Sequence, residues 1–310
     1  MITEKDMYFH TPSSDDPYWA ETNYFGFYVP EEPLHVNVYV LTRQNLGAVL
    51  SSITIVDGFS NSPHLVRYTN NQVHLPFPKT DFDDYSLGNG LAIKCTRPVM
   101  DYDLRFDDGK RLSFAVKYQG LMAPYDIHDP DMDPLAQVSH GGDNVSNTAY
   151  AGHWDQSGRV TGSMKLDGRE FAVDCVASMD HSWGLRKEDQ FANFCWLNAN
   201  FDNDTSIHCI WVINPDDKND YAAIVHGYVR EGSQVYGLVK GKGRVLRNGN
   251  LHVFMDLEVV DKRGRSHRFT GTAFTSNPWQ PWPYVCATHT FMRWELAGVT
   301  GWGEIQEVAM

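Results

Sequence analysis

The chain has 310 residues, of which 42% are hydrophobic and 21% are charged, and its formal net charge is −13. This composition is globular and excludes a disordered chain. The acidic balance argues against a nucleic acid or an anionic membrane as a partner. The first residues show no leader pattern, and no window holds the roughly 18 apolar residues of a membrane helix. We therefore expect a cytoplasmic protein.

Cysteine usage and aromatic content narrow the class of protein further. Five cysteines lie in alternating apolar runs and form no Cys-x-x-Cys pair. This pattern predicts buried free thiols and not a disulfide framework or a zinc site. The 9 Trp, 15 Tyr and 16 Phe supply core packing and could also line a pocket for an apolar ligand.

The N-terminal residues 1–33 contain four prolines, which argue against a long helix. Trp19, Tyr24 and Phe25 indicate that this segment packs on the body of the protein. From Leu34 onward, apolar and polar residues alternate in runs separated by turn sequences such as Asp57-Gly58 and Asn248-Gly249. Period-two runs with Asn-Gly or Asp-Gly between them are typical of β-hairpins. These runs cover 34–41, 48–56, 91–96, 112–118, 160–166, 171–177, 193–201, 207–213, 222–229, 235–246, 251–260, 267–274 and 286–296.

The fold class predicted from this spacing is all-β, with antiparallel barrels or sandwiches. The weakest pattern lies in residues 124–150, which hold several acidic residues and Gly141-Gly142. We interpret this stretch as the linker between two β domains, 1–140 and 141–310. Its sequence Asp129-Pro130-Asp131-Met132-Asp133 lacks the glycine and the closing glutamate of a calcium loop. It is therefore expected to be a solvated acidic loop.

The strongest chemical motif is Asp180-His181-Ser182-Trp183-Gly184-Leu185-Arg186, directly after the predicted strand 171–177. Gly184 can adopt the positive φ of a tight exit from a strand. A carboxylate beside an imidazole suits acid–base chemistry, because it raises the imidazole pKa and orients the ring. The alternative is a structural corner in which Asp180 and Ser182 bond to the backbone, Trp183 fills the core and Arg186 pairs with a carboxylate.

The second half of the chain places polar groups inside its apolar runs. Trp196, Asn198 and Asn200 share one strand face, and His226 and Tyr228 share another. These groups either line a pocket or form the wet face of an antiparallel sheet. The sequence has no Walker loop, no Gly-x-Ser-x-Gly elbow and no tight histidine spacing, so we expect no organic cofactor and no metal.

The motif at 180–186 resembles the D-H-x-W-G-x-R signature of the lipocalin-like superfamily around the carotenoid hydratases. The ending 291–304 and the opening 17–25 resemble a mostly uncharacterised bacterial branch of that superfamily. The resemblance implies two lipocalin-like β units in tandem. It also implies hydration, dehydration, isomerisation or cyclisation of hydrophobic molecules without an organic cofactor. His181 and Trp183 match the family's histidine and tryptophan, whereas its tyrosine and aspartate cannot be placed here.

The function expected from these observations is that of a cofactor-independent lyase or isomerase of the hydratase type. Its substrate would be a terpenoid, steroid or aromatic fragment, and a homodimer is a candidate assembly. His181 would be the catalytic acid/base and Asp180 its orienting group or proton source. The candidate substrate-binding residues are Trp183, Arg186, Trp196, Asn198, Tyr24 and His226. The alternatives are a non-catalytic carrier of an apolar ligand and a cyclase that works by shape alone.

Overall fold

The structure is a computed structural model that describes residues 1–29, 31–136, 149–187, 193–282 and 285–309. Its regular structure is almost entirely β, which confirms the predicted fold class. Two short 3₁₀ turns, η1 (Glu4–Met7) and η2 (Gln44–Leu46), are the helical elements that lie wholly within the described residues. None of these described helices is long and apolar enough to cross a membrane.

The chain forms two compact units. Unit 1 consists of Met1–Ile55, Arg67–Asp126 and Ser146–Lys187, and unit 2 of Val56–Val66, Ile127–Val145 and Glu188–Met310. Strands β10 and β11 thus lie in unit 1, although we expected them in a domain that begins at residue 141. They belong there because β11 pairs with β1 and β10 pairs with β8. The acidic stretch that we interpreted as a linker therefore lies before the last two strands of the first sheet.

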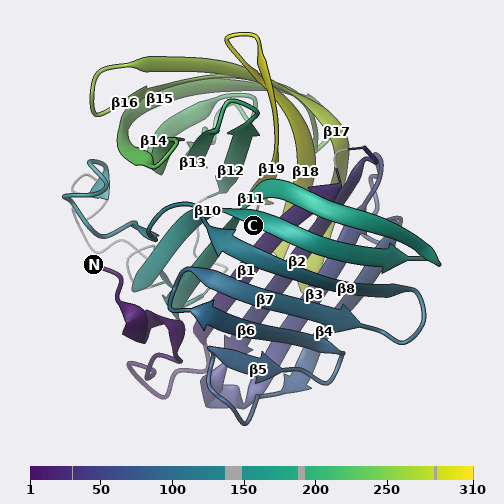
Figure 1. The fold of residues 1–310 in the computed structure, drawn as a ribbon. Helices are drawn as coiled ribbons and strands as arrows, with labels where there is room; N and C mark the ends of the chain where they lie inside the picture. Colours follow the sequence, from purple (N-terminus) through teal and green to yellow (C-terminus); the bar gives the residue numbers. More distant parts are fainter. Residues whose placement is uncertain (30, 137–148, 188–192, 283–284, 310) are drawn as a thin grey trace. The chain divides into compact units, whose positions relative to one another are not determined.

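Unit 1 is built on an open, curled antiparallel sheet with the strand order β4-β3-β2-β1-β11-β10-β8-β7-β6-β5, and β9 pairs with β10 (Figure 1). Its strands are β1 (Trp19–Val29), β2 (Leu34–Arg43), β3 (Ala48–Val56), β4 (Tyr68–Pro76), β5 (Asp84–Ser86), β6 (Leu91–Arg97), β7 (Asp101–Asp107), β8 (Leu112–Gly120), β9 (Tyr125–Asp126), β10 (Gly152–Leu166) and β11 (Arg169–Leu185). Aromatic side chains fill its core, where Phe25 packs edge-to-face on Tyr102 and Tyr118.

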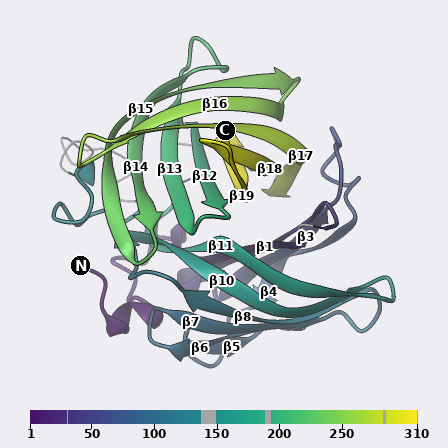
Figure 2. The same ribbon diagram turned by 45° about the horizontal axis from the view of Figure 1, so that its top comes forward.

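Unit 2 is a closed barrel in which each strand pairs with its sequence neighbours and β12 pairs with β19 (Figure 2). Its strands are β12 (Phe194–Phe201), β13 (Thr205–Ile213), β14 (Tyr221–Glu231), β15 (Gln234–Asn248), β16 (Leu251–Asp261), β17 (Ser266–Trp282), β18 (Val285–Leu296) and β19 (Val299–Ala309). Alternate residues of these strands form one apolar core, which includes Leu197, Trp211 and Trp294. Closure leaves the barrel without an unpaired strand edge.

Three sequence expectations need correction. Strand β1 shows no polar and apolar alternation because all eleven of its residues are buried, so its pattern did not reveal it as a strand. All five cysteines are free thiols, as predicted, but only three are buried, because Cys95 is half-buried and Cys286 is exposed. The acidic stretch is not uniformly solvated, because Asp133 is fully buried and its Oδ2 lies 2.5 Å from His226 Nδ1. Residues 137–148 of the expected linker lie outside the described residues.

Candidate functional site

All of the motif at 180–186 except its last residue lies inside a strand and not at a turn, because β11 continues to Leu185. Gly184 does have a positive φ, of 153°, but it adopts it within the strand. Side chains alternate along a strand, so His181 and Trp183 face one side of the sheet while Asp180 and Ser182 face the other. Asp180 therefore cannot orient His181 as we expected.

The acidic partner of His181 is Glu21 on strand β1. His181 lies directly opposite Asn23 of β1, and Glu21 is two positions before Asn23, so the contact runs diagonally across the two strands. His181 Nε2 lies 3.0 Å from Glu21 Oε1, and His10 Nδ1 lies 2.8 Å from the same oxygen. The other carboxylate oxygen, Oε2, accepts from the backbone N–H of His10 at 3.0 Å and from Gln44 Nε2 at 3.3 Å. Asp6 Oδ1 in turn lies 3.1 Å from His10 Nε2. Glu21 is therefore fixed at both oxygens between two imidazoles.

Aromatic rings surround the His181 imidazole. Trp154 stacks on it at a centroid distance of 5.8 Å, and Phe82 and Trp183 meet it edge-to-face at 5.2 and 5.4 Å. Trp183 itself stacks on His10 at 3.6 Å with an interplanar angle of 9°. The imidazole is only 1% exposed. The ring thus lies in an apolar environment. Among the hydrogen bonds described for it, the acidic partner is Glu21.

The N-terminal segment covers this end of the unit 1 core. Phe9 packs on Phe77 and Phe82, each at a centroid distance of 4.7 Å, and its backbone N–H donates to Asp81 Oδ1. His10 follows directly and contacts Glu21 and Trp183. Phe9 and His10 are only half-buried. The N-terminal segment is therefore the partly exposed layer that packs over Phe82 and Trp183.

The electrostatics of the cluster give each group a defined charge. Burial acts to raise the pKa of Glu21, but the bonds from His10 and His181 outweigh it and the pKa is lowered. Burial acts to lower the pKa of His10, but Glu21 and Asp6 outweigh it and the pKa is raised. The pKa of His181 is lowered, because burial outweighs the opposing effect of Glu21. At neutral pH, Glu21 is therefore a carboxylate and His181 a neutral imidazole, while His10 holds its proton to a higher pH than His181 does.

This charge pattern sets the tautomer of His181. A carboxylate can only accept, so Nε2 of the neutral ring carries the proton and Nδ1 carries the basic lone pair. If Nδ1 takes a proton, Glu21 stabilises the imidazolium that forms. The donor atoms of His10, Glu21 and His181 all lie within 4.8 Å of one another and could also hold a divalent cation. The hydrogen bonds within the cluster account for the same atoms without one.

The opposite face of the same strands is buried and polar. Tyr24 lies opposite Asp180 in the strand register, and its hydroxyl donates to Asn37 Oδ1 at 2.5 Å. Arg186 Nη2 donates to Ser182 Oγ at 2.7 Å, and its guanidinium lies 4.8 Å from the Tyr150 ring centroid. The structure therefore brings Tyr24, Asp180 and Arg186 to one face of unit 1 and His181 and Trp183 to the other.

The remaining predicted residues lie in unit 2, on the face opposite to the barrel core. Asn198 Nδ2 donates to Glu304 Oε1 and Asn198 Oδ1 accepts from Asn200 Nδ2. Trp196 and His226 both meet His208 edge-to-face, at 5.2 and 5.6 Å. All of these groups are buried, which contradicts the alternative of a wet face. His208, which joins the predicted residues, was missed because it lies in an ordinary alternating run.

Unit 2 also contains a buried ionic network that sequence reasoning missed. Arg247 donates from Nη1 and Nη2 to the two oxygens of Glu307, both at 2.7 Å. His252 Nε2 lies 3.0 Å from Glu307 Oε2, and its Nδ1 lies 3.1 Å from Thr290 Oγ1. The pKa of Glu307 is lowered to about 2, because His252 and Arg247 outweigh the effect of burial. Each member is hydrogen-bonded, as a structural network inside a barrel requires.

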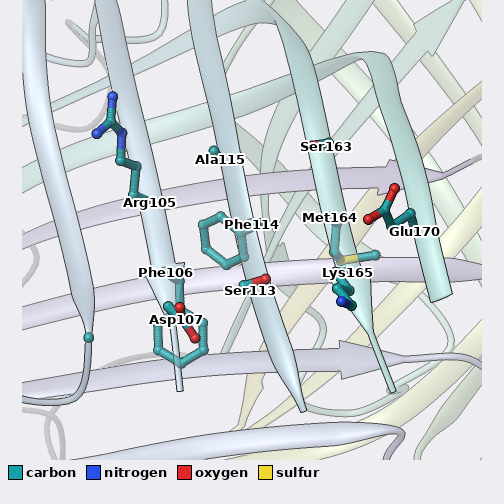
Figure 3. A pocket seen from close by; sticks show the side chains of 11 residues that line it. Arg105, Phe106, Asp107, Ser113, Phe114, Ala115, Ser163, Met164, Lys165 and Glu170 are labelled. Carbon is teal, nitrogen blue, oxygen red and sulfur yellow. The ribbon is translucent and has the colours of Figure 1, made fainter. Parts of the chain in front are cut away.

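A surface depression of about 440 Å³ lies over β7, β8 and β10, where its side chains spread along the strands (Figure 3). Its lining includes Arg105, Phe114, Lys165 and Glu170 and none of the predicted site residues. Arg105, Lys165 and Glu170 are exposed. Because its charged groups are solvated and do not converge on an acid–base group, we assign it no chemical role.

The fold is one that several solved structures share. The chain aligns with an AttH protein (NE1406) from Nitrosomonas europaea at a TM-score of 0.60 and 11% identity, over 96% of this chain and 94% of that one. It aligns with kievitone hydratase from Nectria haematococca at 0.52 and 12%, over 94% and 88%. It aligns with CghA at 0.57 and 13%, over 95% and 89%. At these identities the likeness establishes a common fold.

Residues 3–309 match the family model described as a domain of unknown function, DUF7064. The chain belongs to this family. A search of curated proteins finds no match to the sequence.

Proposed function

We propose that this protein is an acid–base lyase or isomerase of the hydratase type that acts on a hydrophobic small molecule. The observation that carries the proposal is the His10–Glu21–His181 cluster, in which Glu21 and His181 are buried and aromatic rings surround His181. The fold shared with kievitone hydratase supports the proposal, as does the sequence resemblance to the carotenoid hydratases. His181 is the catalytic residue, and Glu21 takes the orienting role that we had expected of Asp180.

The chemistry follows from the protonation states. In a dehydration, His181 Nδ1 removes a proton from the carbon next to the carbinol carbon, and the C–H electrons form the new double bond. The C–O bond breaks, and the imidazolium returns the proton to the departing hydroxide, so that water leaves and His181 is again neutral. Hydration is the same sequence in reverse. An isomerisation returns the proton to another carbon.

The protein contributes to each step through this cluster. Glu21 holds the ring in one tautomer and stabilises the transient imidazolium, and Trp154 offers its π face to the developing cation. General acid–base assistance of this kind is typically worth about 10²–10⁴-fold in rate. The aromatic shell excludes water that would compete for the proton. The same rings would pack against an apolar substrate.

The test is incubation of the wild-type protein and His181→Gln with a panel of terpenoids, steroids and phenylpropanoids in water labelled with oxygen-18. Mass spectrometry then separates the chemical outcomes. Gain of labelled oxygen or loss of water in the wild type alone supports the proposal, as does an isomer formed by the wild type alone. Equal turnover by both proteins would contradict the role of His181 and favour a cyclase that works by shape. Unchanged ligand that copurifies with both would favour a carrier.

A further inference from the structure

His181 lies in the middle of a row of three residues on one face of the sheet. In the strand register it stands opposite Asn23 of β1 on one side and opposite Trp154 of β10 on the other. Directly opposed residues of antiparallel strands have Cβ atoms about 4.5–5.5 Å apart. All three side chains are almost completely buried, with exposed fractions of 0–1%.

Both neighbours of His181 carry a buried polar atom without a hydrogen-bond partner among the described residues. These atoms are the acceptor Asn23 Oδ1 and the donor Trp154 Nε1. The hydroxyl of Tyr85 is a third such atom in the same part of the core. Tyr85 stacks on Phe82, which in turn meets His181 edge-to-face. Folded proteins rarely leave such groups unpaired, so their clustering beside an acid–base residue points to a ligand.

Tyr85 and Asn23 are close neighbours although no hydrogen bond of good geometry joins them. Burial raises the pKa of Tyr85 far above its ordinary value, and the Asn23 amide acts in the opposite direction. The phenol therefore stays protonated and remains a donor at every physiological pH. Trp154 and Tyr85 thus offer two donors and Asn23 offers one acceptor. A neutral oxygen, such as a hydroxyl, can form hydrogen bonds with groups of both kinds.

We propose that Asn23, Tyr85 and Trp154 bind a neutral oxygen, a hydroxyl or a carbonyl, of the apolar substrate beside His181. A hydroxyl can accept from Trp154 or Tyr85 while it donates to Asn23 Oδ1, and a carbonyl can accept from either donor. An anionic substrate is disfavoured, because the Glu21 carboxylate lies 3.0 Å from the imidazole. This assignment rests on the proposed function and deepens it, since it defines the substrate as an uncharged alcohol, enol or ketone.

The experiment compares three probes of one shape: naphthalene, 2-naphthol and 2-naphthoate. Binding is measured by quenching of tryptophan fluorescence in the wild type, His181→Gln, Asn23→Leu and Tyr85→Phe. In the wild type, 2-naphthol should bind about tenfold more tightly than naphthalene, as expected for one or two net hydrogen bonds, and 2-naphthoate should bind most weakly. Asn23→Leu and Tyr85→Phe should each lose most of the advantage of the hydroxyl.

Thermal unfolding of the ligand-free proteins supplies a second readout. Loss of an unpaired buried hydroxyl should leave Tyr85→Phe as stable as the wild type or more stable. Tyr102→Phe is the matched control, because its hydroxyl is also buried but interacts with Cys95, and its ring packs on Phe25 and Tyr118. This variant should bind 2-naphthol as the wild type does.

Equal affinity of the wild type for 2-naphthol and naphthalene, or a wild type that binds neither, would overturn the oxygen site. A preference for 2-naphthol that survives in both Asn23→Leu and Tyr85→Phe would also overturn it. His181→Gln separates this proposal from the proposed function, because it should keep the preference for 2-naphthol even where it has lost turnover. Binding selectivity without any turnover would retain the oxygen site and contradict the enzyme.

Discussion

His181 Nε2 lies 3.0 Å from Glu21 Oε1, although 160 positions separate the two residues in the chain. The contact exists because strand β11 returns across the sheet to pair with β1. It replaces the sequence-local pair of Asp180 and His181 as the acid–base unit. The first three expectations below depend on this contact or on the packing around it, and the fourth concerns the ionic network of unit 2.

The two members of this pair should differ in how their substitution affects turnover. His181→Gln should lower kcat/KM by about 10²–10⁴-fold, because the general base is lost. Glu21→Gln should lower it less, because Nδ1 remains basic while the stabilising charge is gone. Steady-state kinetics on a substrate found by the panel would measure both. Asp180→Asn is the control on the opposite face, and a loss as large as that of His181→Gln there would contradict this assignment.

The pH dependence should report a base whose pKa lies below the ordinary histidine value of 6.5. His181 must be neutral to accept a proton, so kcat/KM should be constant at neutral pH and fall as the pH drops through the lowered pKa. Glu21 acts to raise the pKa of His181. The acidic limb should therefore move to still lower pH in Glu21→Gln. A limb that moves upward in this variant would refute the coupling.

The position of the Trp183 indole should depend on the absence of a side chain at Gly152. A Cβ atom there would lie 2.0 Å from Trp183 Cζ2. Gly152→Ala should therefore displace the indole from His10, cost about 1–3 kcal/mol of unfolding free energy and lower turnover. Urea unfolding and kinetics would test both effects. Gly58→Ala is the control, because a Cβ at that position meets no atom within 4 Å.

Glu307 should stabilise unit 2 over a defined range of pH. Its pKa is lowered to about 2 in the folded protein, from an ordinary value of 4.5. A carboxyl group whose pKa is depressed by folding contributes stability above its unfolded pKa, and this contribution fades as the pH falls toward the folded value. Glu307→Gln leaves Arg247 buried without its counter-charge and should cost about 3–5 kcal/mol at pH 7.

Denaturant unfolding at several pH values would measure the effect of Glu307→Gln. The difference from the wild type should shrink as the pH falls from 4.5 toward about 2. Glu258→Gln should change stability little at any pH, because Glu258 is only half-buried and its partner Lys242 is exposed. A constant difference across this range would show that the loss is one of packing and not of charge.

The sequence predicted the all-β fold because most strands have one polar and one apolar face. Strand β1 escaped detection because both of its faces are buried, and β11 was predicted too short because its last residues are polar and buried. Alternation of apolar and polar residues in a sequence reveals a strand only when one of its faces is exposed. Neither β1 nor the end of β11 has such a face. The boundary near residue 140 was placed at the weakest pattern, whereas long-range pairing of β11 with β1 decides which unit a strand joins.

Only part of the candidate site was within reach of the sequence. The Asp-His-x-Trp motif identified His181 and Trp183, but nothing local shows that Asp180 faces the other way once the strand continues. Glu21 lies in the segment 17–25, which contributed to the family resemblance. The one feature of the sequence that could have indicated its role is that it is an acidic residue in an aromatic stretch. His10 was undetectable, because its role depends on how the N-terminal segment folds back over the sheet.

The most direct test of the central assignment is nitrogen-15 NMR of the histidine side chains, titrated from pH 5 to 8 in the wild type with His181→Gln as the assignment control. The expected result is a neutral His181 at pH 7 with its proton on Nε2 and a pKa below 6.5. The pKa of His10 should lie above 6.5, so that this ring keeps its charge to a higher pH than His181 does. A His181 that is charged at pH 7, or neutral with its proton on Nδ1, would contradict its role as a base held by Glu21.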